Sequence, residues 1–272
     1  PAVAAGRGYL FEYDHTGGKI TDNAGARDKR EGKERLRCLV AETGEELWHY
    51  EYDRPYNLSY PSGPRCTPTV DGDRVYILGA EGDLTCLKTA DGSVVWKKSF
   101  VDDFMAPTPI WGHSSHPLVD GDTLYCLVGG EGSVVVAFDK LTGKEKWRAL
   151  SAPSMNNEVG YCPPSMIEHE GQPQLVVFYP EAVARLDPAS GEVLWTVPII
   201  PAYGMSIAQP LPIDNRLFVT GYGGASVYFK LPEADAKWEV LWMGMAKTSV
   251  SSANVSPIAG PEGKTIFGVD AN

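Results

Sequence analysis

Short apolar runs, each bounded by turn residues, recur along the whole chain. The clearest example is residues 68–76, PTVDGDRVY, which residues 117–125 repeat as PLVDGDTLY. Asp-Gly between two runs rich in β-branched and aromatic residues is typical of a β-hairpin, because the tight turn needs positive φ. No stretch shows a sustained apolar period of about 3.6 residues, so the pattern predicts an all-β chain.

The same unit continues with two further strands after this hairpin. The run at residues 75–78 is followed by a glycine-containing turn at Glu81 and Gly82 and by a third run at residues 84–87. Asp91 and Gly92 then turn the chain into a fourth strand that ends at Trp96. Four short antiparallel strands in about 45 residues are what one blade of a β-propeller requires.

Tryptophans mark this repeat along the chain. Their spacings are 48, 51, 48 and 47 residues for Trp48, Trp96, Trp147, Trp195 and Trp242. A glycine stands four residues before each of the first four, at Gly44, Gly92, Gly143 and Gly191. A bulky aromatic in each unit predicts a wedge between neighbouring sheets, and the glycine supplies the turn before it. We therefore expect these residues to dock one blade on the next.

A proline before each new series of runs marks where the units begin. The predicted blades are residues 1–67, 68–116, 117–163, 164–209, 210–256 and a partial sixth at 257–272. They form one incomplete propeller domain, since a propeller of this length counts as a single domain. The sequence opens inside the first strand of one blade and stops inside another, which predicts an internal piece of a longer chain.

One end of each predicted blade is more variable than the other. The turns between the first and second strands and between the third and fourth are tight and nearly uniform, whereas the links between blades differ in length and composition. The largest insertion, at residues 14–35, is densely charged with both signs and is predicted to be a charged loop on the same face as these links. We expect function on that face.

Composition narrows the function classes. The net charge of −11 argues against nucleic-acid binding, which relies on basic patches. The five cysteines form no C-x-x-C motif, and no segment of the sequence is predicted to span a membrane. Cys38 and Cys86 are interpreted as small core residues rather than reactive thiols.

The tryptophan phrase resembles the docking motif of the PQQ-type β-propeller repeats, Ala-x-Asp-x-x-x-Gly-x-x-x-Trp. Ala137, Asp139, Gly143 and Trp147 match it throughout, and the other units match it in part. That family includes quinoprotein dehydrogenases and the propeller lipoprotein that assists outer-membrane protein assembly, and its architecture is similar to that of WD40 and YVTN repeats. The resemblance implies a ring of seven or eight blades, of which this chain holds five and part of a sixth, and an exported protein of the periplasm or cell envelope.

The positions closest to the propeller axis are those just before each blade-opening proline. We expect a polar funnel mouth formed by Arg65, His113, His116, Asn157, Glu158, Tyr161, Gln209 and Asn254. The resemblance implies that PQQ and Ca²⁺ would bind there in a dehydrogenase, with oxygen ligands such as those of Asn156, Asn157 and Glu158. The adjacent-cysteine pair and haem motif of those enzymes do not occur in this sequence, and His113 and His116 have no third ligand at zinc spacing.

The sequence therefore predicts a non-catalytic scaffold that binds a protein partner through the loop face. No catalytic residue, metal ligand or cofactor is predicted, and a small-molecule ligand stays undefined. The first alternative is a PQQ- and Ca²⁺-dependent alcohol or sugar dehydrogenase. The second is a carbohydrate-binding propeller, suggested by the mouth aromatics Tyr56, Tyr60, Trp111, Tyr161 and Tyr203.

Overall fold

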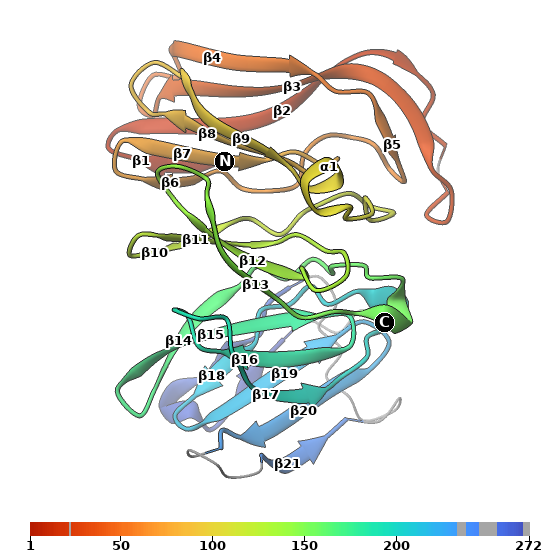
Figure 1. Cartoon of the computed structure of the whole chain (residues 1–272), viewed down its shortest axis with the longest axis vertical. Coiled ribbons are helices and arrows are strands. Elements are labelled where there is room, and N and C mark those ends of the chain that lie inside the picture. Colours follow the sequence, from red (N-terminus) through yellow and green to blue (C-terminus); the bar gives the residue numbers. More distant parts are fainter. Residues whose placement is uncertain (22, 233–237, 245–254, 269–272) are drawn as a thin grey trace. The chain divides into compact units, whose positions relative to one another are not determined.

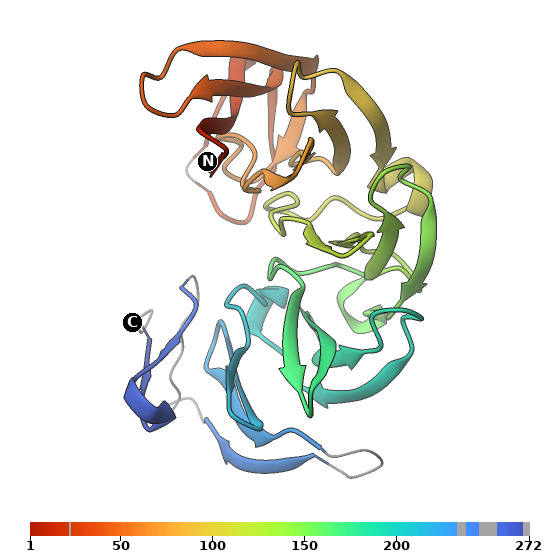
Figure 2. The same ribbon diagram turned by 90° about the vertical axis from the view of Figure 1, so that its left-hand side faces the viewer.

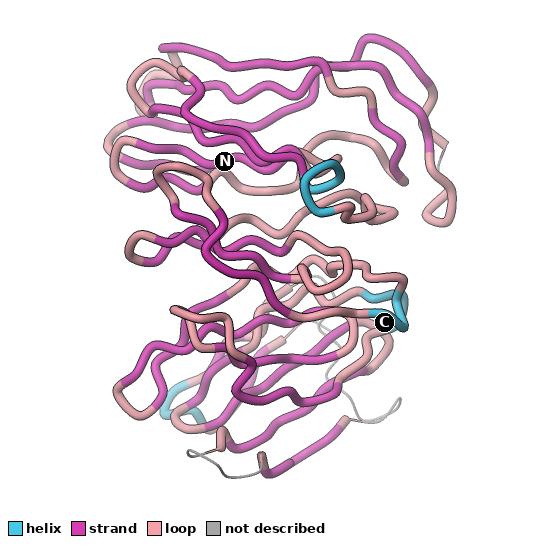
Figure 3. Tube along the Cα trace, in the orientation of Figure 1, coloured by secondary structure: helices cyan, strands magenta, loops and turns pink. Residues whose placement is uncertain are grey.

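The computed structural model describes residues 1–21, 23–232, 238–244 and 255–268. Antiparallel strands dominate them, with one short α-helix, α1 (Phe100–Phe104), and three 3-10 helices at Pro153–Met155, Ala202–Gly204 and Pro261–Gly263 (Figure 3). The expected all-β architecture of four-stranded antiparallel sheets is confirmed. The contacts divide the chain into two compact units, which are described separately: Pro1–Gly130 with Val136–Lys146, and Glu131–Val135 with Trp147–Asn272.

The first unit begins with a five-stranded sheet. Its strands are β1 (Ala2–Ala4), β2 (Arg7–Gly18), β3 (Asp28–Val40), β4 (Glu46–Asp53) and β5 (Tyr56–Leu58). The order is β1-β2-β3-β4, and β5 pairs with β3. The second sheet has the order β6 (Thr69–Asp71), β7 (Arg74–Leu78), β8 (Asp83–Lys88), β9 (Val94–Ser99). Strands β1 to β4 of the first sheet and β6 to β9 of the second form meanders in which each strand lies beside the next one along the chain (Figure 1).

A third sheet supplies residues to both units. It runs β10 (Leu118–Asp120), β11 (Thr123–Leu127), β12 (Val135–Asp139), β13 (Glu145–Ala149).

The second unit contains two further four-stranded meanders and a small hairpin. The first is β14 (Ser165–His169), β15 (Gln172–Tyr179), β16 (Ala182–Leu186), β17 (Val193–Pro198). The second is β18 (Leu211–Ile213), β19 (Arg216–Gly221), β20 (Ala225–Lys230), β21 (Glu239–Met243), and the hairpin is β22 (Ile258–Ala259) with β23 (Ile266–Phe267). Every sheet lies inside one of the intervals expected for a blade, and Figure 2 shows the strands of each from a second side.

The repeat tryptophans lie beside a local irregularity of their sheets. Trp48 pairs with Cys38 and Trp96 with Cys86, and in each case the register shifts at the next residue of the partner strand. In the second unit Trp195 pairs with Arg185 in the same way. A β-bulge increases the local twist and redirects a side chain, so the tryptophan side chain is redirected in the same way in these three sheets.

Three of the tryptophans, Trp48, Trp96 and Trp147, pack on the turn of the following sheet. The indole N–H of Trp48 donates to Thr89 O at 3.1 Å, and a Cβ placed on Gly92 would lie 2.6 Å from Trp48 Cε3. The same contact recurs in the first unit between Trp96 and the turn at Lys140 and Gly143. It occurs again in the second unit, where Trp147 donates to Pro188 O at 3.1 Å and lies against Gly191. Glycine is needed at these turns both for positive φ and for the close approach of the ring.

The insertion at residues 14–35 differs from its prediction. Instead of a loop, most of it is a long extension of β2 and β3, whose pairing continues from Tyr13 opposite Glu34 to Gly18 opposite Arg30. Charged residues follow one another along β3. Arg35 is paired with Asp14 and Glu51 on one face, at 2.8 Å each. Successive residues of a strand face opposite sides, so this segment has one solvated, charged face and one buried face. The many charged residues therefore led to the prediction of a loop instead of a strand.

The core of each unit is built from the inward-facing residues of its sheets. In the first unit Leu36, Cys38, Val75, Ile77 and Leu87 lie fully buried between the first two sheets. All five cysteines of the chain are buried and unbridged. Burial raises the thiol pKa of Cys38 and Cys86, which fits their interpretation as core residues.

Candidate functional site

The residues expected at the funnel mouth are divided between the two units. Arg65, His113 and His116 belong to the first, and Asn157, Glu158, Tyr161 and Gln209 belong to the second. Asn254 lies outside the described residues.

In the first unit Arg65 forms hydrogen bonds to two connecting segments. Its guanidinium donates to Tyr60 O at 2.8 Å and also to Trp111 O. His113 follows in the same connection, but its ring is not at a polar mouth: it is 1% exposed and lies edge-on to Phe100, with centroids 5.3 Å apart. Burial lowers the pKa of His113 to about 3. The expectation for His113 is therefore wrong, because the apolar packing keeps a neutral imidazole away from water.

In the second unit the connection from β13 to β14 folds back on itself and contacts the next connection. Asn157 has φ 57° and donates its backbone N–H to Ala152 O at 2.9 Å. Its Oδ1 is buried and has no hydrogen-bond partner among the described residues. Tyr161, 7% exposed, donates its N–H to Ser206 O at 3.0 Å. Gln209 donates its N–H to Ser256 Oγ at 3.0 Å.

The residues of this second group offer few ligands for calcium or a quinone. The segment around Asn157 and Glu158 offers one buried amide oxygen and one carboxylate. Ca²⁺ takes about six to eight oxygen ligands, so these residues alone do not fit such a site. Across the described ranges, no group of three or more His, Cys, Asp or Glu side chains is placed to hold a metal ion.

The mouth aromatics are also arranged differently from the expectation. Tyr56 and Tyr161 are 2% and 7% exposed and therefore present no free ring face. Tyr203 is 72% exposed on the connection between β17 and β18.

The most unusual chemistry of the first unit lies around Glu34, which the sequence did not single out. Glu34 is fully buried on β3. Its carboxylate accepts from the hydroxyl of Tyr56 at 2.5 Å, from the hydroxyl of Tyr52, and from the backbone N–H of Ala80 at 2.8 Å. Burial raises the pKa of Glu34, although these three donors oppose the shift. Among the described residues Glu34 forms no ion pair, so these hydrogen bonds compensate the buried carboxyl group.

The three donors come from three different elements. Tyr52 lies directly opposite Glu34 on β4, Tyr56 lies on β5, and Ala80 belongs to the turn between β7 and β8 of the next sheet. Tyr13 stacks on Tyr56 with ring centroids 4.0 Å apart. Glu34 therefore fastens the extended hairpin to the second sheet. The sequence does hold one indication that Glu34 is buried. Glu34, Leu36 and Cys38 stand at every second position and so share one face of the strand, and Leu36 and Cys38 are core residues.

A polar groove lies next to this cluster, between β4 and the strands β8 and β9. Its volume is about 380 Å³. It is lined by Tyr50, Tyr52, Arg54, Asp83, Thr85, Lys97, Lys98, Ser99, Asp102 and Asp103. Arg54 donates to Asp83 across the groove. Burial raises the pKa of Asp83, and the nearby Arg54 charge opposes that shift.

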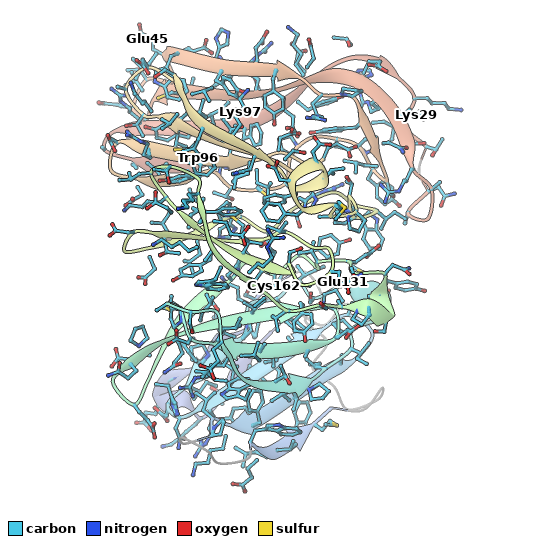
Figure 4. The ribbon with its side chains drawn as sticks, in the orientation of Figure 1. Lys29, Glu45, Trp96, Lys97, Glu131 and Cys162 are labelled. Atoms are coloured by element: carbon cyan, nitrogen blue, oxygen red, sulfur yellow. The ribbon has the colours of Figure 1, made fainter. Side chains whose placement is uncertain are left out.

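One wall of this groove is aromatic. The rings of Tyr50 and Tyr52 have centroids 5.7 Å apart. The ammonium group of Lys97, which extends from β9 (Figure 4), lies 5.1 Å from the Tyr50 centroid and 5.8 Å from that of Tyr52. An exposed cation over an aromatic face gains about 0.5–1 kcal/mol, so Lys97 is held over this wall only weakly.

A second, smaller groove of about 330 Å³ lies in the second unit. It is lined by Glu168, His169, Glu170, Asp214, Asn215 and Leu231, at the turns between β14 and β15 and between β18 and β19. His169 contacts Pro232 O through Nε2 at 3.3 Å.

Four-stranded meanders joined by repeated tryptophan–glycine contacts define a PQQ-like β-propeller protein, as the sequence predicts. The family model described as outer membrane protein assembly factor BamB matches residues 32–255, and the chain belongs to that family. None of the helices described is both long and apolar enough to cross a membrane.

Solved structures with the same fold include a BamB protein and a methanol dehydrogenase. BamB from Moraxella catarrhalis is 18% identical to this chain and superposes with a TM-score of 0.61. The match covers 93% of this chain and 76% of the BamB chain. A europium-containing methanol dehydrogenase is 11% identical and superposes with a TM-score of 0.52. That match covers 86% of this chain and 51% of the dehydrogenase chain. At these identities the likeness concerns the fold alone.

One curated relative is an enzyme subunit. The dehydrogenase subunit of the quinone alcohol dehydrogenase of Komagataeibacter europaeus is 29% identical over 139 residues, which is 45% of this chain. The chain spans only 18% of the length of that subunit.

Proposed function

We propose that the chain is a protein-interaction scaffold in outer-membrane protein assembly, located in the periplasm or cell envelope. It binds its partner through the connections that leave the outermost strand of each sheet. The family match over residues 32–255 supports the process. The observation that supports the binding surface is Met105, an apolar side chain that is 87% exposed on such a connection.

Met105 is presented by a well-anchored turn. It follows α1, whose Phe100 and Phe104 are buried, and the Ser99 hydroxyl caps the start of that helix by accepting from the Asp102 N–H at 3.1 Å. Met105 itself has φ 54°, and its backbone N–H bonds to Phe100 O. A non-glycine residue persists in this conformation only where surrounding contacts hold it.

The corresponding connection of the second unit has a similar feature. Ile200 is 64% exposed and Tyr203 is 72% exposed, with φ 58° at Tyr203. Exposed apolar side chains on preorganised turns suit partner binding, because little conformational freedom remains to be lost on association.

Val94 provides a matched control for Met105. It begins β9, whereas Met105 follows the helix after the end of β9, and Val94 is 42% exposed. A photocrosslinking residue at position 105 of the full-length protein, in cells, should capture one defined component of the outer-membrane assembly machinery. The same residue at position 94 should not.

Substitution gives a second measurement. Met105→Glu should reduce the level of assembled outer-membrane proteins by severalfold, since a charge would be buried in the interface, whereas Val94→Glu should leave it unchanged. Equal crosslinking at both positions, or normal assembly in Met105→Glu, would contradict this surface.

A PQQ- and Ca²⁺-dependent dehydrogenase is the second candidate, supported by the 29% identity to the quinone alcohol dehydrogenase subunit. PQQ and Ca²⁺ added to the complete protein test it directly. Saturable PQQ binding and dye-linked alcohol oxidation, both lost in Glu158→Ala, would replace the scaffold proposal with the enzyme.

A further inference from the structure

The groove between β4 and the strands β8 and β9 is a second candidate binding site. It shares Asp102 and Asp103 of α1 with the connection that presents Met105, but Met105 itself does not line it. It is large enough for a small molecule, since such sites have volumes of roughly 300–1,000 Å³. Its walls come from the first two sheets and from α1, all within the first unit.

Hydrogen-bonding groups of the lining are left without partners. The hydroxyl of Tyr50, the Nε of Arg54 and Asp83 Oδ2 are buried atoms with no hydrogen-bond partner among the described residues. Arg54 Nε needs an acceptor, Asp83 Oδ2 in its ionised form needs a donor, and the Tyr50 hydroxyl can act as either. Buried polar groups of this kind are normally satisfied by ordered water or by a ligand.

The charge of the groove restricts the ligand. The lining contains three cationic side chains, Arg54, Lys97 and Lys98, and three carboxylates, Asp83, Asp102 and Asp103. An anion would meet the carboxylates and a cation would meet the basic groups, so a neutral ligand fits best. Because the unpartnered atoms need both a donor and an acceptor, that ligand should carry hydroxyl groups.

The aromatic wall adds a preference for a flat apolar face. The tilted rings of Tyr50 and Tyr52 form this wall, and the hydroxyl of Tyr52 is fixed by its bond to Glu34. A pyranose ring combines one C–H face, which packs on aromatic rings, with hydroxyl groups around its edge. Lys97 covers the wall, but its long exposed side chain can move aside at little cost.

We propose that this groove binds a neutral saccharide. One sugar ring packs on Tyr50 and Tyr52. Neighbouring hydroxyls accept from Arg54 Nε and donate to Asp83 Oδ2. Glu34 is a positioning residue, since it holds Tyr52 without touching the sugar.

Binding is tested with the complete protein and three neutral disaccharides, namely maltose, cellobiose and N,N′-diacetylchitobiose, by calorimetry. At least one of them should bind saturably. Tyr50→Ala and Asp83→Asn should each weaken binding by about tenfold or more, since each removes a direct contact. Asp71→Asn is the control for Asp83→Asn, because Asp71 is paired with Lys140 outside the groove.

Lys97→Ala distinguishes a sugar from an anion. It should leave saccharide affinity unchanged or raise it, because the aromatic wall is uncovered, whereas an anion site would be lost. Inorganic phosphate should neither bind nor compete. If Tyr50→Ala does not fold, as judged by its melting curve, Asp83→Asn alone carries the comparison.

Absence of saturable binding by all three sugars would overturn the proposal, as would binding unchanged in Asp83→Asn or displaced by phosphate. Met105→Glu should bind sugar normally. The saccharide site and the scaffold surface can therefore fail independently.

Discussion

The contact between the first two sheets of the chain is held differently at its two ends. At one end Trp48 packs on Gly92 and donates to Thr89 O. At the other end Glu34 accepts from Tyr52, Tyr56 and Ala80 N–H, and the polar groove lies beside it. One end is an aromatic wedge on a glycine turn, and the other is a buried carboxyl group with uncharged donors.

The tryptophan end recurs, whereas within the described residues the Glu34 end does not. Trp96 and Trp147 make the same contacts with their own turns. Glu34 stands four residues before Cys38, the partner of Trp48, and Gly82 has the corresponding place before Cys86. Gly82 is already in a turn with φ 96°, whereas β3 is still a strand at Glu34. A contact that repeats serves the architecture, so the contact that occurs once is where a specific function should be sought.

The largest effect should follow removal of a repeated wedge. Trp147 is 9% exposed and packs against Gly191. Trp147→Ala should lower the free energy of unfolding by about 3–5 kcal/mol, as for other large aromatic truncations in cores. Urea unfolding measures it, with Trp147→Phe as the milder comparison. A loss below about 1 kcal/mol would show that the wedge is not structural.

The glycine of the docking turn should have a smaller effect, and the chain provides its own control. Gly44 and Gly92 have φ values of 74° and 72°. A Cβ at Gly92 would lie 2.6 Å from Trp48, whereas a Cβ at Gly44 has no atom within 4 Å in the part of the chain described here. Both alanine variants are destabilised by the positive φ, but only Gly92→Ala also meets the Trp48 ring. Gly92→Ala should therefore lower the free energy of unfolding by about 1–3 kcal/mol more than Gly44→Ala does.

Equal melting shifts in the two glycine variants would show that the ring moves aside freely. The contact between Trp48 and Gly92 would then tolerate an added methyl group, although the same contact is repeated along the chain.

The smallest effect concerns Glu34 and depends on pH. Burial raises the pKa of Glu34 from its ordinary value of 4.5, so the folded chain binds this proton more tightly than the unfolded chain. The stability from this group is therefore complete below pH 4.5 and is lost as the pH rises through the raised pKa. Relative to Glu34→Gln, the wild-type chain should become steadily less stable over that window.

Urea midpoints measured from pH 4 to pH 8 test this sign. Glu31→Gln is the control, because it removes the same charge from an exposed position of the same strand. A Glu34→Gln difference that is independent of pH would mean that Glu34 titrates alike in both states, and the contrast between the two ends would weaken.

Much of the fold could be predicted because its signals are local or periodic. The Asp-Gly turns, the tryptophan phrases and the absence of a helical period pointed to four-stranded meanders, and Ala137 to Trp147 carried the family resemblance. The insertion was harder to interpret. A run of charged residues is typical of a polar loop, and the buried positions Glu34, Leu36 and Cys38 of this strand begin with a glutamate. A buried glutamate breaks the usual rule that buried strand positions are apolar.

The candidate site was less accessible to sequence reasoning. His113 was expected to be at a polar mouth because of its place before a blade-opening proline, but its exposure depends on how Phe100 packs, a contact that the sequence does not encode locally. Met105 had no signal beyond lying in a variable connection.

The sequence by itself determined the strand repeat, the turns and the wedge residues, because each depends on backbone preferences or on side-chain size within a few residues. Only the tertiary structure decided which groups meet. Glu34, Tyr52, Tyr56 and Ala80 come from three strands and a turn, and Asp83 faces Arg54 from a different sheet. Electrostatics and cavities depend on distances between such groups in space, and those distances exist only after the sheets have packed.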